Sequence, residues 1–221
     1  MNDLPATIVA VTVWTYWACV VALVVRSHVR FRTAAGAVPH TARERLLWWL
    51  WAPAILSWQF LPLLAAATSH PFCGLPALAV EHHGIYGLRL AAAAVGVLAF
   101  AATIPCWLGM GRNWSMAVVP RKRTRLITTG MFSRVRHPIY ALSLLLMLAT
   151  MVSVPTPAMI AIGLVHLWMI RDKALSEERF LRQLHGDEYT MYCSRTGRFL
   201  PRVFASQCDA AEPRPEKHRA A

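Results

Sequence analysis

The sequence predicts an all-α integral membrane protein with five transmembrane helices, followed by a cytoplasmic C-terminal amphipathic helix. Helices four and five are expected to form a helix-turn-helix hairpin. Three observations predict this fold class. Apolar residues make up 56% of the 221 residues and charged residues only 15%, a balance too apolar for an ordinary soluble domain. The apolar residues form runs of about 20, enough to cross the hydrocarbon core of a bilayer as a helix. Short basic clusters separate these runs.

Three apolar runs each predict one full transmembrane helix, because no charged residue interrupts their middle. They extend from Pro5 to Val25, from Leu46 to Ala67 and from Leu90 to Met110. A fourth apolar stretch, from Pro138 to Ile170, is long enough for nearly two passes. It is interrupted by Val154-Pro155-Thr156-Pro157, where the prolines remove backbone donors and disfavour helical geometry in the preceding residues. This stretch therefore predicts the hairpin.

The distribution of basic residues predicts the orientation of the helices. The loops after the first and third helices contain five and seven basic residues, whereas residues 69–86, after the second helix, contain no lysine or arginine. The positive-inside rule then places the N-terminus outside and the C-terminus in the cytoplasm, and we expect a bacterial inner membrane. The net charge of +12 is concentrated in these loops, where it attracts anionic membrane lipids. No basic face suited to nucleic acid remains.

The chain divides into three predicted parts. Residues 1–110 hold three transmembrane helices with a basic cytoplasmic loop, residues 111–202 hold the hairpin and the functional residues, and residues 203–221 form a disordered tail rich in alanine, proline and charge. Within the second part, Arg171 to Leu200 is charged and amphipathic and is expected to form a helix docked under the membrane domain. Glu81-His82-His83 lacks further ligands at fixed spacing, so no metal site is expected.

Polar residues concentrate in two places that flank the hairpin. The first ends in Arg136-His137-Pro138-Ile139-Tyr140. Pro138 suits the first turn of a helix, which places His137 at the N-cap, where backbone donors favour an anionic group. Tyr140 lies one turn further on and faces the same side. Taken alone, the segment also fits an ordinary interfacial helix start that has a snorkelling arginine and an anchoring tyrosine.

The second polar place extends from Arg171 to Glu178. On a helix, Lys173 and Glu177 share a face, which also fits a simple salt bridge between neighbouring turns. Because both places flank one tight hairpin, we expect them to meet in space. Further down, His166 lies at membrane depth, where an ionisable side chain either has a function or is neutral and hydrogen-bonded across the bundle.

A series of motifs connects the two places in a fixed order. The motifs are Gly111-Arg112-Asn113-Trp114-Ser115, Thr124 to Phe132, Arg136 to Tyr140, Arg171-Asp172-Lys173, Glu177-Glu178, His185 to Tyr189, Tyr192 and Leu200-Pro201. Set around a membrane hairpin, this pattern resembles the isoprenylcysteine carboxyl methyltransferase family and its bacterial relatives. The resemblance covers residues 111–201, less than half of the chain.

The resemblance implies a fold in which the hairpin and the C-terminal helix enclose S-adenosylmethionine, while an isoprenoid or other amphiphilic substrate enters from the bilayer. Carried over by position, it implies a cofactor-binding set of Thr124, Arg125, Leu126, Ile127, Phe132, His137, Pro138, Ile139, Tyr140 and Glu177. The methyl group of the cofactor is already activated, so catalysis is mainly positioning. Lys173 or Arg171 would orient an anionic acceptor, and a carboxylate acceptor needs no general base.

The sequence departs from the family pattern at the position that bears on the acceptor. Lys173 stands where the family has an arginine that contacts the substrate carboxylate, and lysine offers a point charge in place of a bidentate fork. A phospholipid N-methyltransferase is therefore an alternative. An NADPH-dependent membrane reductase of related fold and a non-catalytic membrane scaffold are two further alternatives, and cofactor binding separates them.

Overall fold

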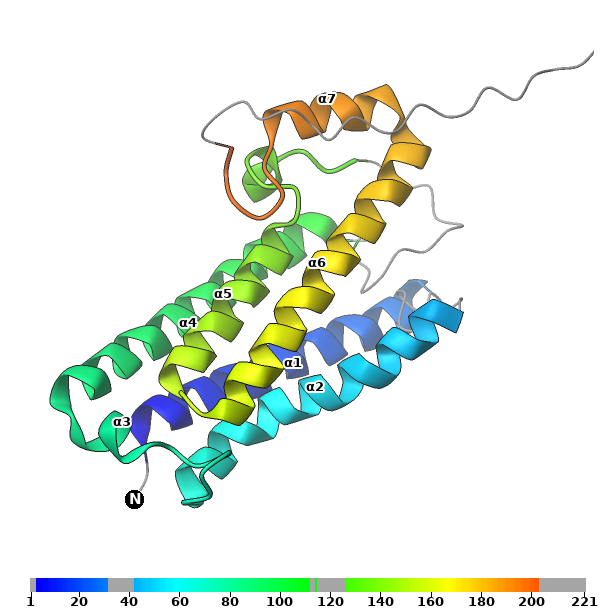
Figure 1. The fold of residues 1–221 in the computed structure, drawn as a ribbon. Coiled ribbons are helices and arrows are strands. Elements are labelled where there is room, and N and C mark those ends of the chain that lie inside the picture. Colours follow the sequence, from blue (N-terminus) through cyan, green and yellow to red (C-terminus); the bar gives the residue numbers. More distant parts are fainter. Residues whose placement is uncertain (1–2, 32–41, 112–113, 115–125, 203–221) are drawn as a thin grey trace, which may run out of the picture.

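The computed structural model describes residues 3–31, 42–111, 114 and 126–202, and the regular elements among them are helices. Five long helices pack into one bundle (Figure 1): α1 (Leu4–Phe31), α2 (Ala42–Ala67), α4 (His83–Met110), α5 (Pro138–Ser153) and α6 (Pro157–His185). The short helices α3 (Ala77–Glu81) and α7 (Asp187–Arg195) lie at opposite ends of this bundle. We call these ends the α3 end and the α7 end. The prediction of an all-α fold is confirmed.

Among the described residues, three helices are long and apolar enough to cross a membrane. These spans are Leu4–Arg30, Trp48–Ala67 and His83–Met110. They contain the three predicted transmembrane segments, apart from the first residues of the second. Helix α5 is apolar but has only 16 residues, so at about 1.5 Å per residue it falls short of a bilayer core about 30 Å thick. Membrane crossing by α5 and α6 stays a prediction.

The hairpin between α5 and α6 turns where the prolines predict it. Helix α5 ends at Ser153, and α6 begins at Pro157 with Thr156 as its N-cap. The Thr156 hydroxyl accepts a hydrogen bond from the Met159 amide at 3.1 Å, which satisfies one of the unpaired donors of the first helical turn. The position of the turn is therefore set by local sequence, as predicted.

Helix α6 is longer than the sequence analysis predicted. A boundary was expected at Ile170, yet the helix continues without interruption to His185. Nothing in residues 171–185 breaks a helix, because they contain no proline or glycine. Gly186 then ends α6 with φ of +55°, a conformation that favours glycine, and α7 follows. The amphipathic segment is thus the extension of the fifth long helix plus α7, and residues 196–202 are not helical.

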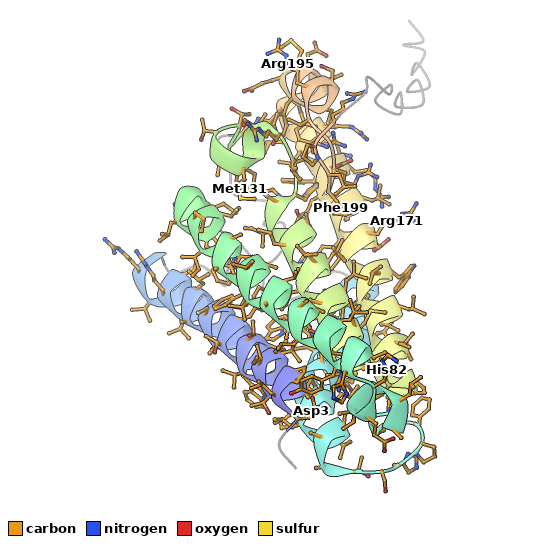
Figure 2. The ribbon with its side chains drawn as sticks, turned by 90° about the vertical axis from the view of Figure 1, so that its left-hand side faces the viewer. Asp3, His82, Met131, Arg171, Arg195 and Phe199 are labelled. Carbon is orange, nitrogen blue, oxygen red and sulfur yellow. The ribbon has the colours of Figure 1, made fainter. Side chains whose placement is uncertain are left out.

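The α3 end is closed around Arg89. Helix α4 begins at His83 instead of Leu90, so Arg89 lies within the helix, and it is 1% exposed. Its guanidinium donates to the Ser153 carbonyl at 2.8 Å, the Ala79 carbonyl at 2.9 Å and the Asp3 carboxylate at 2.6 Å. This arginine therefore ties the chain start, α3, α4 and the hairpin turn together. Figure 2 shows Asp3 at this end and Arg195 and Phe199 at the other.

The buried interior contains a polar pair between α5 and α6. His166 is 2% exposed, and its Nε2 atom lies 3.2 Å from the Ser143 hydroxyl. The imidazole also packs against the Trp58 ring of α2, with centroids 4.9 Å apart. His166 is thus hydrogen-bonded across the bundle, which matches the second of the two alternatives for this residue.

Candidate functional site

The candidate site begins at the N-terminus of α5. His137 is the N-cap and Pro138 occupies the first turn, as predicted. The His137 side chain makes no capping hydrogen bond. By helix geometry, the amides of Ile139 and Tyr140 have no carbonyl acceptor within the helix. These amides and the positive end of the helix dipole are suited to hold a carboxylate.

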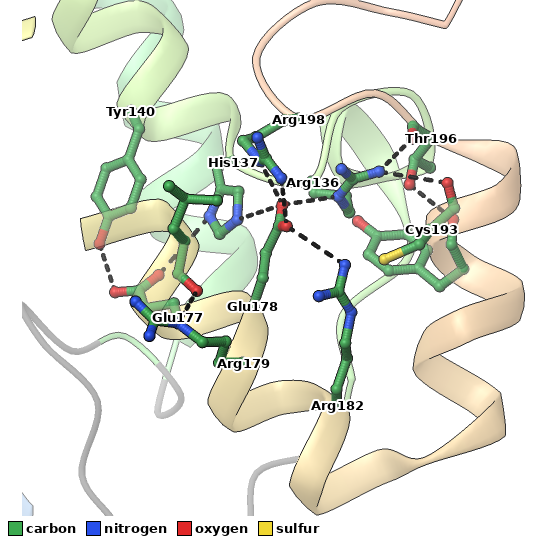
Figure 3. A network of polar contacts seen from close by, with 12 residues as sticks. Arg136, His137, Tyr140, Glu177, Glu178, Arg179, Arg182, Cys193, Thr196 and Arg198 are labelled. Atoms are coloured by element: carbon green, nitrogen blue, oxygen red, sulfur yellow. Dashed lines mark hydrogen bonds and ion pairs between the residues drawn. The ribbon is translucent and has the colours of Figure 1, made fainter. Parts of the chain in front are cut away.

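Glu177 of α6 faces the start of α5 (Figure 3). The Tyr140 hydroxyl donates a hydrogen bond to Oε1 of Glu177, and Nδ1 of His137 lies 3.7 Å from Oε2. The rings of His137 and Tyr140 lie parallel, with centroids 5.4 Å apart. The Glu177 side chain is 20% exposed, so its carboxylate is still accessible. The two predicted polar places therefore do meet in space.

Glu178, the next residue, points to a different set of partners. It is 1% exposed, and its carboxylate accepts two hydrogen bonds of 2.9 Å from Arg198 and one of 3.0 Å from Arg136. Nε2 of His137 lies 3.4 Å from Oε1. Burial opposes ionisation of this carboxyl, but the neighbouring His137, Arg198 and Arg136 outweigh burial and hold the pKa of Glu178 well below its usual range. Glu178 is therefore a fixed negative charge.

A C-terminal segment, Thr196–Phe199, closes this side of the site. The Arg136 amide donates to the Gly197 carbonyl at 2.8 Å, and the His137 amide donates to the Arg198 carbonyl at 3.1 Å. A Cβ atom on Gly197 would lie 1.8 Å from the Leu200 carbonyl oxygen, so only glycine fits this turn. The segment before α5 thus pairs with the C-terminal segment through a single isolated parallel bridge, between Val135 and Gly197.

Lys173 and Arg171 have different surroundings. The Lys173 ammonium lies 5.1 Å from the ring centroid of Trp51 in α2 and 5.5 Å from that of Tyr140. Lys173 is therefore beside the group formed by His137, Tyr140 and Glu177. Arg171 is exposed and points away from the bundle (Figure 2). The structure brings the first of the two predicted acceptor-orienting residues to the site and leaves the second outside it.

The remaining predicted residues lie in the segment that precedes α5. Leu126, Ile127 and Phe132 are half-buried, and the carbonyl of Phe132 accepts a hydrogen bond of 2.6 Å from Tyr192 of α7. Phe132 belongs to the short 3-10 helix η2 (Gly130–Ser133). Thr124 and Arg125 lie outside the described residues. The described part of the predicted pocket wall is thus apolar and tied to α7.

Sequence reasoning missed the central role of Glu178 and did not single out Arg198. One signal was present, because Glu178 follows Glu177 directly and consecutive helical residues point about 100° apart. The two adjacent carboxylates must therefore point in different directions. Nothing in the spacing of the sequence identifies Arg198 as one of those partners, since the two residues meet only through the fold of α7.

Residues 92–183 match the model of the Isoprenylcysteine carboxyl methyltransferase (ICMT) family. The match includes α5, most of α6 and the residues His137, Tyr140, Lys173 and Glu177, but ends before α7 and the C-terminal segment. No curated protein matches the chain. The helices around the site are thus similar to the isoprenylcysteine carboxyl methyltransferase family, a family of membrane methyltransferases.

Proposed function

We propose that this protein transfers a methyl group from S-adenosylmethionine to an amphiphilic acceptor at the cytoplasmic surface of the membrane. The acceptor is a carboxylate of the isoprenylcysteine type or another lipid-like molecule. The observation that carries the proposal is the convergence of His137, Tyr140 and Glu177 at the start of α5, within the region that matches the family. Membrane topology follows from the basic loops, as the positive-inside rule requires.

The described residues fit the methionine end of this methyl donor. Glu177 offers a partly exposed carboxylate to an ammonium group, and the uncapped first turn of α5 offers amides to a carboxylate. Nε2 of His137 is buried against Glu178, so the ring can present its other edge, Nδ1, beside Glu177 to the methyl donor. The half-buried Leu126, Ile127 and Phe132 offer apolar surface to the adenosine. These four features match the groups that S-adenosylmethionine carries.

The chemistry asks little of the protein beyond positioning. The donor supplies a methyl group already activated by its sulfonium, so the residues of this chain need only bind, align and exclude water. Lys173 lies beside Tyr140 and provides a positive charge for an anionic acceptor. Tyr140 connects the donor side of the site with the acceptor side. Its hydroxyl donates a hydrogen bond to Glu177, and its ring faces Lys173.

Calorimetry with S-adenosylhomocysteine tests the proposal on the detergent-purified protein. We expect micromolar binding of this product and none of NADPH. His137→Ala and Glu177→Ala should each weaken binding by at least about tenfold, roughly 1.4 kcal/mol, because each removes a polar or charged partner. Glu188→Ala is the matched control, since Glu188 is an exposed glutamate of α7 away from the start of α5. Unchanged binding in both site variants would overturn the site, and binding of NADPH alone would favour a reductase.

A further inference from the structure

Arg198 holds His137 through two independent contacts. Its guanidinium forms two parallel hydrogen bonds of 2.9 Å with the Glu178 carboxylate, whose Oε1 atom lies 3.4 Å from Nε2 of His137. Its main-chain carbonyl accepts a hydrogen bond from the His137 amide at 3.1 Å. One residue, 61 positions along the chain from His137, therefore fixes both the backbone and the side-chain surroundings of that histidine.

The orientation of the Glu178 carboxylate depends on the two parallel hydrogen bonds from Arg198, which we call the Arg198 fork. Arg136 binds only the Oε1 atom, whereas Arg198 binds both oxygens and so fixes the plane of the carboxylate. The position of Oε1 in turn fixes what Nε2 of His137 faces. The other ring nitrogen, Nδ1, is then directed towards Glu177 at 3.7 Å. The imidazole lies between two carboxylates, one held rigidly and one open to the site.

We infer that Arg198 is a positioning residue of the methyl-donor site. It acts through Glu178 to set the orientation and tautomer of His137, so that the Nδ1 edge and Glu177 face the donor. This inference rests on the proposed function. It extends the site beyond residues 92–183, the region that matches the family, to the C-terminal segment Thr196–Phe199.

A purely mechanical role for Arg198 is the competing explanation, and Arg202 provides the control for it. Arg202 lies in the same C-terminal stretch and bonds the Cys193 carbonyl at 3.1 Å and the Ser194 carbonyl. It fastens this stretch to α7 by contacts to main-chain carbonyls. If fastening were all that Arg198 contributes, Arg202→Gln and Arg198→Gln would have similar effects.

The test compares Arg198→Gln, Arg198→Lys and Arg202→Gln in full-length protein, with binding of S-adenosylhomocysteine and the melting temperature as readouts. We expect Arg198→Gln to weaken binding by about tenfold and Arg202→Gln to leave it within about twofold at a similar loss of thermal stability. Arg198→Lys should be intermediate, because lysine keeps the charge but cannot form the fork. Equal losses for Arg198→Gln and Arg202→Gln would overturn the inference.

A second measurement applies even if a variant loses stability. The 15N chemical shifts of the His137 imidazole report its tautomer, and the spectrum of His137→Ala assigns this signal among the nine histidines. Arg198→Gln should change these shifts and Arg202→Gln should not; unchanged shifts in Arg198→Gln would contradict the positioning role. If the wild-type protein binds S-adenosylhomocysteine and Arg198→Gln binds it equally tightly, this inference alone is overturned. Wild-type protein that does not bind it overturns the proposed function as well.

Discussion

The two ends of the bundle each contain a buried ionic cluster, and the two clusters are built differently. At the α3 end, one arginine, Arg89, is held by one carboxylate and two main-chain carbonyls. At the α7 end, one carboxylate, Glu178, is held by Arg198 and Arg136, with Arg182 at 3.8 Å and His137 at 3.4 Å. Both central residues are 1% exposed. The difference lies in their partners.

In the α3 cluster, Arg89 is satisfied by the Asp3 carboxylate and two main-chain carbonyls, so this cluster ties elements together. The α7 cluster gathers four cationic or ionisable side chains, Arg136, Arg182, Arg198 and His137, around one carboxylate, and its His137 also faces Glu177, whose side chain is 20% exposed. The α7 cluster is therefore connected through His137 to a carboxylate that a ligand can reach. We therefore propose that the α3 end serves stability and that the α7 end binds the methyl donor, and four predictions test this division.

The largest expected effect is that of Glu178→Gln, which keeps the shape of the side chain and removes its charge. Arg136 and Arg198 would then lose their shared buried counter-charge, at a cost of about 3–5 kcal/mol in stability. The melting temperature should fall, and binding of S-adenosylhomocysteine should be lost. A variant with wild-type stability and wild-type binding would contradict the central place of Glu178.

Arg89→Met should cost a similar amount of stability, about 3–5 kcal/mol, because it leaves the Asp3 carboxylate without its buried partner. It should leave the affinity for S-adenosylhomocysteine unchanged at temperatures where the protein is folded. Melting curves and calorimetry on the same preparation separate the two effects. A loss of affinity in folded Arg89→Met would break the division between the two ends.

Gly197→Ala should act mainly on the site. Its Cβ would overlap the Leu200 carbonyl oxygen, so the C-terminal segment must shift and its pairing with Arg136 and His137 must weaken. We expect binding to fall by about tenfold, since one or two hydrogen bonds that support His137 are lost. The matched control is Gly87→Ala, because a Cβ at Gly87 in α4 meets no atom within 4 Å. Equal affinities of the two variants would show that the pairing is dispensable.

The smallest expected effect is that of pH. The pKa of Glu178 is lower in the folded state than in the unfolded state, where it is about 4.3. The ionised carboxylate therefore contributes its full stabilisation above about pH 4.3. This stabilisation is lost only as the pH falls through the folded-state pKa. The difference in melting temperature between wild-type protein and Glu178→Gln should therefore be constant from pH 5 to pH 8. A difference that shrinks between pH 6 and pH 5 would show that Glu178 is not held ionised.

Much of the fold could be predicted from the sequence, because length and polarity decide where membrane helices form. The prolines at 155 and 157 set the hairpin turn for a local reason. The predicted start of α4 was wrong, because Arg89 looked like part of a loop. A buried arginine is stable in this helix only because Asp3 and two distant carbonyls accept its hydrogen bonds. The boundary expected at Ile170 was also wrong, because a change in polarity along a helix does not end it.

The site was predictable where local rules apply. Pro138 and the N-cap role of His137 follow from helix-start chemistry, and the meeting of the two polar places follows from the hairpin, although their specific contact, Tyr140 with Glu177, was not predicted. The link between Arg198 and Glu178 could not be predicted, because it depends on the reversal of the chain at Gly186 and on the path of α7. Lys173 as the acceptor-orienting residue stays a prediction, as does Arg171.

Amide hydrogen exchange of the full-length protein tests the central claim most directly, because it reports both ends of the bundle in one experiment. With saturating S-adenosylhomocysteine, exchange should slow in residues 126–141 and 173–185 and stay unchanged in residues 77–89. NADPH should change neither end. Slower exchange confined to residues 77–89, or no change anywhere at saturating ligand, would contradict a methyl-donor site at the α7 end.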